Sequence, residues 1–205
     1  KLALEGISTG GGFLWASYLK DASTNIIQFD LTGKQIRAVQ LPDIGTVAGF
    51  GGYKSDQEFF YTFTNFTTPG TIYRYDIAQA SSTLYKKSEL KANTDGFETR
   101  QVFYTSKDGT KVPMFIVHKK GIKLDGNNPV FLYAYGGFQI SLTPAFSLSR
   151  MLFLEKGGIY VQPSLRGGSE YGEAWHKAGM LEKKQNVFDD FIAAAEWLIA
   201  NRYTR

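Results

Sequence analysis

The sequence of 205 residues predicts an α/β protein in which a strand-rich first part precedes a sheet that is combined with helices. Three observations predict this class. Residues 1–90 alternate short β-branched and aromatic runs with turn residues at intervals of about ten positions. Residues 91–205 contain an Asp-Gly hairpin and nearly continuous apolar runs. Residues 185–201 carry apolar side chains at helical spacing.

The first part reads as a series of short strands. Their β-branched and aromatic residues predict strands at Phe13–Leu19, Asn25–Asp30, Gln35–Leu41, Glu58–Phe63 and Thr71–Asp76. A strand that ends in Asp before a polar turn occurs at Asp30 and again at Asp76. Evenly spaced strands are typical of a sandwich, a barrel or propeller blades, and the repeated motif favours blades.

The second part begins with a hairpin. Residues 101–105 and 112–117 alternate around the turn at Asp108-Gly109, and Asp-Gly is a strong hairpin signal. Pro113 lies inside the second of these strands. Because proline cannot donate to the ladder, this residue predicts an edge position.

Strands and helices then alternate. Residues 129–135 and 159–161 are apolar runs of the kind expected for buried strands. Ser147 is a candidate N-cap for a helix through Leu154, and residues 185–201 form the last helix. The order of hairpin, strand, helix, strand and helix predicts a sheet with crossover connections.

Composition excludes several classes of protein. The chain has no cysteine, so it forms neither disulfides nor thiolate metal sites. No stretch of about 18 apolar residues is present, so we expect no membrane span. The net charge is +4, and the excess of basic residues lies in the second half of the chain, where it is diluted by acidic residues. The basic cluster Lys119–Lys123 is interpreted as a solvated surface. We therefore expect no nucleic-acid partner.

The first candidate site is Tyr135-Gly136-Gly137-Phe138, just past a predicted strand. Ligands of open α/β sheets bind beyond the carboxyl ends of the strands. Paired glycines let the backbone approach a substrate closely, and a phenol there is a neutral donor for a developing oxyanion. The residues alone leave open a second interpretation, a strand that ends in a glycine turn beside an aromatic core residue.

A second glycine-rich segment is Arg166–Gly172. It lacks the Gly-Lys-Ser/Thr of a phosphate-binding loop, and its glycines are misplaced for a dinucleotide fingerprint. We interpret it as a tight loop whose shape is fixed by Arg166 and Glu170.

No nucleophile is evident. Ser8 stands in a G-x-S-x-G match, but a nucleophile elbow needs a buried strand before it and a helix after it, and residues 1–15 provide neither. His118 and His176 read as surface or packing residues. Asp189 and Asp190, at the start of the last helix, suit a capping or buried structural role better than acid–base chemistry.

Five motifs resemble the prolyl oligopeptidase family of serine peptidases in order and spacing. They are Lys107–Gly121, Leu132–Phe138, Arg166–Gly172, Trp175–Lys177 and Lys184–Phe191. Phe59-Phe60-Tyr61 and Thr68–Tyr73 resemble the last blades of the family's propeller. The resemblance implies an N-terminal portion of an α/β-hydrolase (peptidase) domain at 91–205, preceded by C-terminal β-propeller blades at 1–90.

The resemblance also implies roles for two residues. Tyr135 corresponds to the tyrosine that stabilises the oxyanion, and Phe138 to a residue that lines the pocket for the substrate's proline ring. Ala134 and Ser169 stand where the family frequently has Gly, and Pro163–Leu165 stand where an Asn is common. These departures concern the local shape of the loops.

The activity implied for the full-length protein is hydrolysis of short peptides on the carboxyl side of proline. The family's G-G-S-x-G-G elbow follows the last helix, and the chain stops at Arg205. We therefore expect the catalytic serine, aspartate and histidine to be absent from this chain, and the chain alone to be inactive. We expect no cofactor or metal, short proline-containing peptides as partners, a monomeric full-length protein, and a cytoplasmic location with the periplasm as alternative.

Two other functions stay open. One is an oligopeptidase of the same clan with another specificity, such as for basic residues. The other is a non-catalytic, propeller-type module that binds peptides. A truncated product without function would leave open sheet edges, which favour aggregation.

Overall fold

The computed structural model describes residues 2–90 and 94–205. The described chain forms two compact units. The first contains residues 2–90 and the short segment Thr143–Phe146, and the second contains residues 94–142 and 147–205. The domain boundary expected at residues 90 and 91 adjoins the segment 91–93, which lies outside the described residues.

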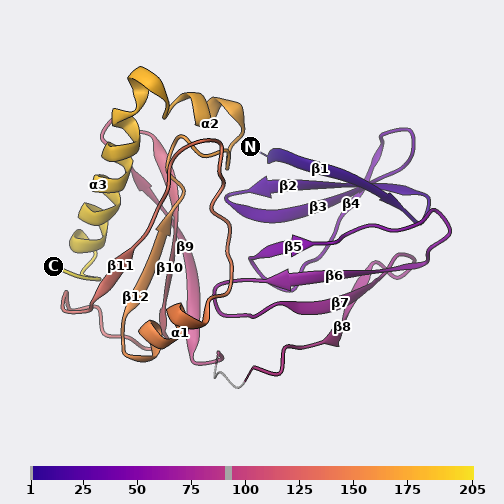
Figure 1. Ribbon diagram of the computed structural model, residues 1–205, viewed down its shortest axis with the longest axis horizontal. Helices are drawn as coiled ribbons and strands as arrows, with labels where there is room; N and C mark the ends of the chain where they lie inside the picture. The colour runs from indigo at the N-terminus through magenta and orange to yellow at the C-terminus, as the bar shows by residue number, and fades with distance from the viewer. Residues whose placement is uncertain (1, 91–93) are drawn as a thin grey trace. The chain divides into compact units, whose positions relative to one another are not determined.

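The first unit consists of two antiparallel sheets of four strands each, and in both sheets the strands are ordered as they follow in the chain (Figure 1). The strands of the first sheet are β1 Leu2–Gly10, β2 Phe13–Lys20, β3 Ser23–Phe29 and β4 Gln35–Ala38. Those of the second are β5 Thr46–Ala48, β6 Glu58–Thr64, β7 Thr71–Asp76 and β8 Ser81–Lys86. The five predicted strands are confirmed, whereas β1, β5 and β8 were not predicted.

Aromatic rings from both sheets fill the core of the first unit. Trp15 is 1 % exposed, and its ring packs edge-on against Phe59 and Tyr75 with centroids 5.3 and 5.7 Å apart. The repeated motif also has a structural basis. The carboxylates of Asp30 and Asp76 each accept a backbone N–H in the turn between the third and fourth strands of their sheets.

The second unit is a mixed sheet with helices. Its elements are β9 Phe97–Thr105, β10 Lys111–Lys119, β11 Val130–Leu132, α1 Leu148–Glu155, β12 Ile159–Pro163, α2 Glu173–Lys177, the 3-10 turn η1 Leu181–Lys183, and α3 Gln185–Ala200. The strand order is β11-β12-β10-β9, in which β11 and β12 are parallel and the other pairs antiparallel.

Helices cover this sheet, with α3 and α1 on opposite sides of it in Figure 1. Met114 and Ile116 of β10 form a core with Ala194 and Leu198 of α3, all of them at most 1 % exposed. Ser147 caps α1 by accepting the N–H of Arg150, as predicted. No helix among the described residues has the length and apolar character that crossing a membrane requires.

The edge position predicted from Pro113 is wrong. β10 lies between β9 and β12. The carbonyl oxygen of Pro113 accepts the N–H of Ser164, so the nitrogen of Pro113 also faces the chain that follows β12. β12 ends at Pro163, and the ladder of hydrogen bonds does not continue past it. The N–H that proline lacks therefore costs little stability at this position.

The prediction of a buried strand at 129–135 is also wrong in two respects. Only Val130–Leu132 form a strand, and Phe131 is 55 % exposed. Within the described chain β11 pairs with β12 alone. The apolar run of a parallel strand is buried only where both of its neighbours and both layers of helices are present.

Candidate active site

The Tyr135–Phe138 turn lies beyond the carboxyl end of β11. Gly136 has φ +62°, and a Cβ there would lie 2.5 Å from Cγ1 of Val187, so only glycine fits. The side chains on both sides of the glycine pair point away from the core, because Tyr135 is 46 % and Phe138 is 84 % exposed. Their ring centroids are 6.5 Å apart. The alternative of an aromatic core residue at this turn is therefore wrong.

Two other segments hold the turn in place. The Lys184 ammonium donates to the Gly136 carbonyl at 2.7 Å. The loop at 166–172 packs so closely that a Cβ on Gly167 would lie 2.6 Å from the same carbonyl oxygen. The N–H of Gln139 donates to the Gly167 carbonyl at 3.2 Å. The backbone that carries Tyr135 is thus fixed from both the loop and the start of α3.

The contact of Lys184 yields a first prediction. In the full-length protein, Lys184→Met keeps the apolar stem but removes the donor, so the Gly136 carbonyl loses its charged partner. We expect the Gln139 N–H, which lies just after the turn and bonds the Gly167 carbonyl, to exchange with deuterium about tenfold faster, because the turn is held less firmly. Lys184→Arg keeps a donor and should restore most of the protection. Equal losses of protection in both variants would contradict a positioning role.

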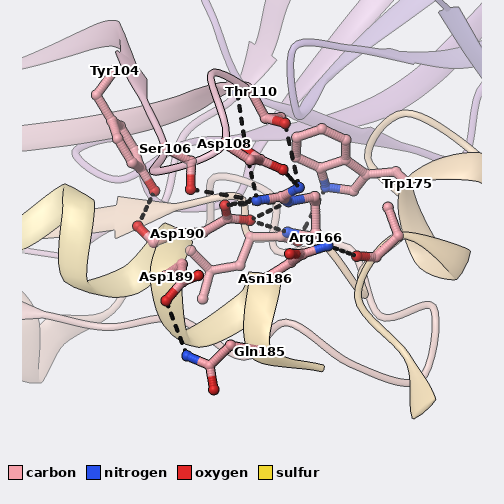
Figure 2. Close-up of polar contacts among 12 residues, drawn as sticks. Tyr104, Ser106, Asp108, Thr110, Arg166, Trp175, Gln185, Asn186, Asp189 and Asp190 are labelled. Atoms are coloured by element: carbon pink, nitrogen blue, oxygen red, sulfur yellow. Dashed lines mark hydrogen bonds and ion pairs between the residues drawn. The ribbon is translucent and has the colours of Figure 1, made fainter. Parts of the chain in front are cut away.

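A buried ion-pair network anchors the 166–172 loop (Figure 2). The Arg166 guanidinium, only 4 % exposed, donates to the carboxylates of Asp190 and Asp108. The fully buried Asp190 carboxylate also accepts the backbone N–H of Arg166 at 3.1 Å. On the far side of the loop, Glu170 accepts the N–H of Leu142 at 3.0 Å. The predicted structural roles of Arg166 and Glu170 are confirmed.

Asp108, the exposed member of this network, makes the stability of the second unit depend on pH in the acid range. The hydrogen bond from Arg166 lowers the pKa of Asp108 from 3.8 to about 2. A lowered pKa stabilises the fold above pH about 4, and that contribution is lost as the pH falls towards 2. Because the Asp108 side chain is 46 % exposed, screening by solvent limits this contribution to the free energy of unfolding to roughly 1 kcal/mol. Urea unfolding of Asp108→Asn should show a flatter pH dependence in this window, and an unchanged slope would contradict it.

The remaining candidates do not form a catalytic triad within the described residues. Ser8 lies in β1 and donates to the Phe50 carbonyl at 2.5 Å, so it is no nucleophile elbow. His118 is 2 % exposed and donates through Nδ1 to the Lys119 carbonyl, which confirms a packing role. His176 donates through Nδ1 to the Gly167 carbonyl at 2.7 Å and so braces the loop. No three His, Asp or Glu side chains of the described chain are placed to hold a metal ion.

The start of α3 decides between the two predicted roles of Asp189 and Asp190. This helix begins at Gln185, so both residues lie in its second turn and the predicted capping role is wrong. Asp189 bonds the amide of Gln185 at 2.9 Å, whereas Asp190 takes the buried structural role that was the other half of the prediction.

A pocket of about 360 Å³ opens beside Phe138. It is lined by Gly137, Phe138, His176, Gly179, Met180, Leu181 and Lys184. Sequence reasoning singled out Phe138 but missed Met180, Leu181 and Lys184. Lys184 opens one of the five family-like motifs, which was the available signal, whereas nothing in the sequence marks Met180 or Leu181.

Two family models match the chain. The model described as the prolyl oligopeptidase N-terminal beta-propeller domain matches residues 1–88. The model described as the prolyl oligopeptidase family matches residues 144–205. The first sheet-rich unit thus corresponds to propeller sequence, and the second match begins just ahead of α1.

Similar proteins agree with these matches. The prolyl endopeptidase of Elizabethkingia miricola is 52 % identical over 97 % of this chain and 28 % of its own length. A structure from a study of two prolyl endopeptidases is 47 % identical with a TM-score of 0.93, over 100 % of this chain and 30 % of that one. Prolyl oligopeptidase B from Galerina marginata, bound to a 25mer macrocyclization substrate, is 38 % identical with a TM-score of 0.91, over 100 % of this chain and 29 % of that one. The chain spans less than a third of the length of these relatives, and it belongs to the prolyl oligopeptidase family of serine peptidases.

Proposed function

We propose that the full-length protein containing this chain is a serine-type oligopeptidase that hydrolyses short peptides on the carboxyl side of proline. Residues 1–90 supply C-terminal blades of its β-propeller, and residues 91–205 supply the N-terminal portion of its α/β-hydrolase domain. The observation that carries the proposal is the pair of exposed side chains, Tyr135 and Phe138, on either side of a glycine pair beyond β11. The relatives named prolyl endopeptidase support the choice of proline.

Each of the two side chains has a defined task. A serine outside this chain attacks the carbonyl of the substrate's proline, and a histidine takes the serine proton and passes it to the leaving amine. The Tyr135 hydroxyl donates to the oxygen as negative charge develops on it. The Phe138 ring offers a flat apolar wall to the proline ring. No step needs a metal or a cofactor.

The test compares peptide amides with the full-length protein. We expect a Gly-Pro amide to be hydrolysed and an Arg-Arg amide to be left intact, and a serine-reactive phosphonate to abolish the turnover. Preference for Arg-Arg would replace the proposal by the other specificity within the clan. Peptide binding without any turnover would point to the non-catalytic module.

The chain of 205 residues provides a separate check. Alone it should hydrolyse neither amide, because the described residues bring no serine, histidine and carboxylate together as a triad. Phosphonate-sensitive turnover by the purified chain would overturn this part of the proposal.

A further inference from the structure

Two large apolar side chains near the candidate site are held in an unfavourable backbone conformation. Phe138 has φ 50° and Leu181 has φ 51°, values that residues with a Cβ rarely adopt. The described residues leave both side chains uncovered, since Phe138 is 84 % and Leu181 is 73 % exposed. Within the described chain, neither the strain nor the exposure is offset by burial. Such outliers cluster at ligand-binding segments, where the geometry serves the ligand.

The two strained residues line the same pocket, although they are more than forty positions apart in the sequence. Met180 adds a flexible apolar wall, and Gly137 and Gly179 leave room between the two segments. The volume of about 360 Å³ is ample for one large side chain together with part of its backbone.

One corner of the pocket is polar and basic. The Lys184 ammonium has three donors, and within the described residues its one hydrogen bond is to the Gly136 carbonyl. The positive charge of Lys184 would repel a cationic side chain, whereas a peptide carbonyl beside an apolar side chain would find a donor in its ammonium.

We propose that this pocket is a second specificity site for the peptide substrate, one that takes a large apolar side chain such as Leu or Phe and rejects Lys and Arg. This inference rests on the proposed function. Phe138, the proposed wall for the proline ring, also lines this pocket, whereas Tyr135 does not. A proline bound beside Tyr135 and Phe138 therefore has this pocket next to it. The pocket then receives a neighbouring residue of the substrate.

The experiment uses the full-length protein and peptides with one proline, in which each of the two residues before and after it is varied in turn among Leu, Ser and Lys. In the wild type, kcat/KM at one of these positions should be about tenfold higher for Leu than for Ser, and lowest for Lys. Leu181→Gly should reduce the Leu-to-Ser ratio at that position to about twofold or less. Ile199→Ala, which changes an exposed apolar residue that does not line the pocket, should keep the wild-type ratio.

Other outcomes are equally informative. An unchanged ratio in Leu181→Gly overturns the pocket assignment, while turnover of the Gly-Pro amide by the wild type keeps the proposed function intact. Glycine suits φ 51°, so the variant should melt no lower than the wild type. A clear fall in its melting temperature would mean that Leu181 is packed against the rest of the protein, which also overturns the assignment. If no peptide is hydrolysed, the proposed function fails, and the ratio of peptide dissociation constants in the same variants still decides the pocket.

Discussion

Asp190→Ala should lower the free energy of unfolding of the second unit by about 3–5 kcal/mol. Removing this carboxylate leaves the guanidinium of Arg166 buried with one of its two carboxylate partners gone. It also removes the acceptor of the Arg166 backbone N–H. Asp108 cannot compensate, because its half-exposed carboxylate bonds the other side of the guanidinium. The loss of stability reflects the penalty of a buried, unpaired charge rather than the net contribution of the ion pair to stability.

The neighbouring aspartate is a matched control for this substitution. Asp189→Ala removes the same group from the same helix but breaks only a hydrogen bond to Gln185 at the surface. Its effect on urea- or heat-induced unfolding of the full-length protein should stay within about 0.5 kcal/mol. Replacing both partners by apolar residues, Arg166→Met with Asp190→Leu, should cost less than Asp190→Ala alone. Similar losses for Asp189 and Asp190 would show that helix electrostatics, not the buried pair, causes the effect.

The sequence predicted strands from β-branched and aromatic runs bounded by turns. These runs identified both β6, which is buried at every second position, and β4, which is exposed throughout. β1 is interrupted by Gly6 and β8 begins with two serines, so neither contains such a run. The edge position predicted from Pro113 was wrong for a different reason. Whether a missing donor matters depends on where the neighbouring strand ends, and that is a property of the assembled sheet.

The site was predictable only in part for a related reason. A positive φ at Gly136 can be expected because the residue is glycine, whereas the residue types of Phe138 and Leu181 give no indication of their positive φ. The sequence predicted a capping or a buried role for Asp190. The start of α3 at Gln185 excludes capping, and the contact with Arg166, 24 positions away, explains the burial. Contacts over long sequence separations require the fold.

Tyr135→Phe in the full-length protein should lower kcat on a Gly-Pro amide by about 10²–10³-fold. In the proposed role the hydroxyl group acts only on charge that develops in the transition state, so KM should change little. Stability should also be preserved, because Tyr135 is 46 % exposed and its hydroxyl makes no hydrogen bond within the described residues. Steady-state kinetics and thermal unfolding of the same preparation measure both quantities.

A second tyrosine of the same segment makes the comparison specific. Tyr133 is 43 % exposed and lies two positions before Tyr135, so Tyr133→Phe removes the same group from nearly the same place. Its kcat should stay within about twofold of the wild type. A raised KM with unchanged kcat in Tyr135→Phe would mean that the hydroxyl holds the bound substrate and the transition state equally well. In that case the phenol beyond β11 is a binding group, and the oxyanion must be stabilised by donors outside this chain.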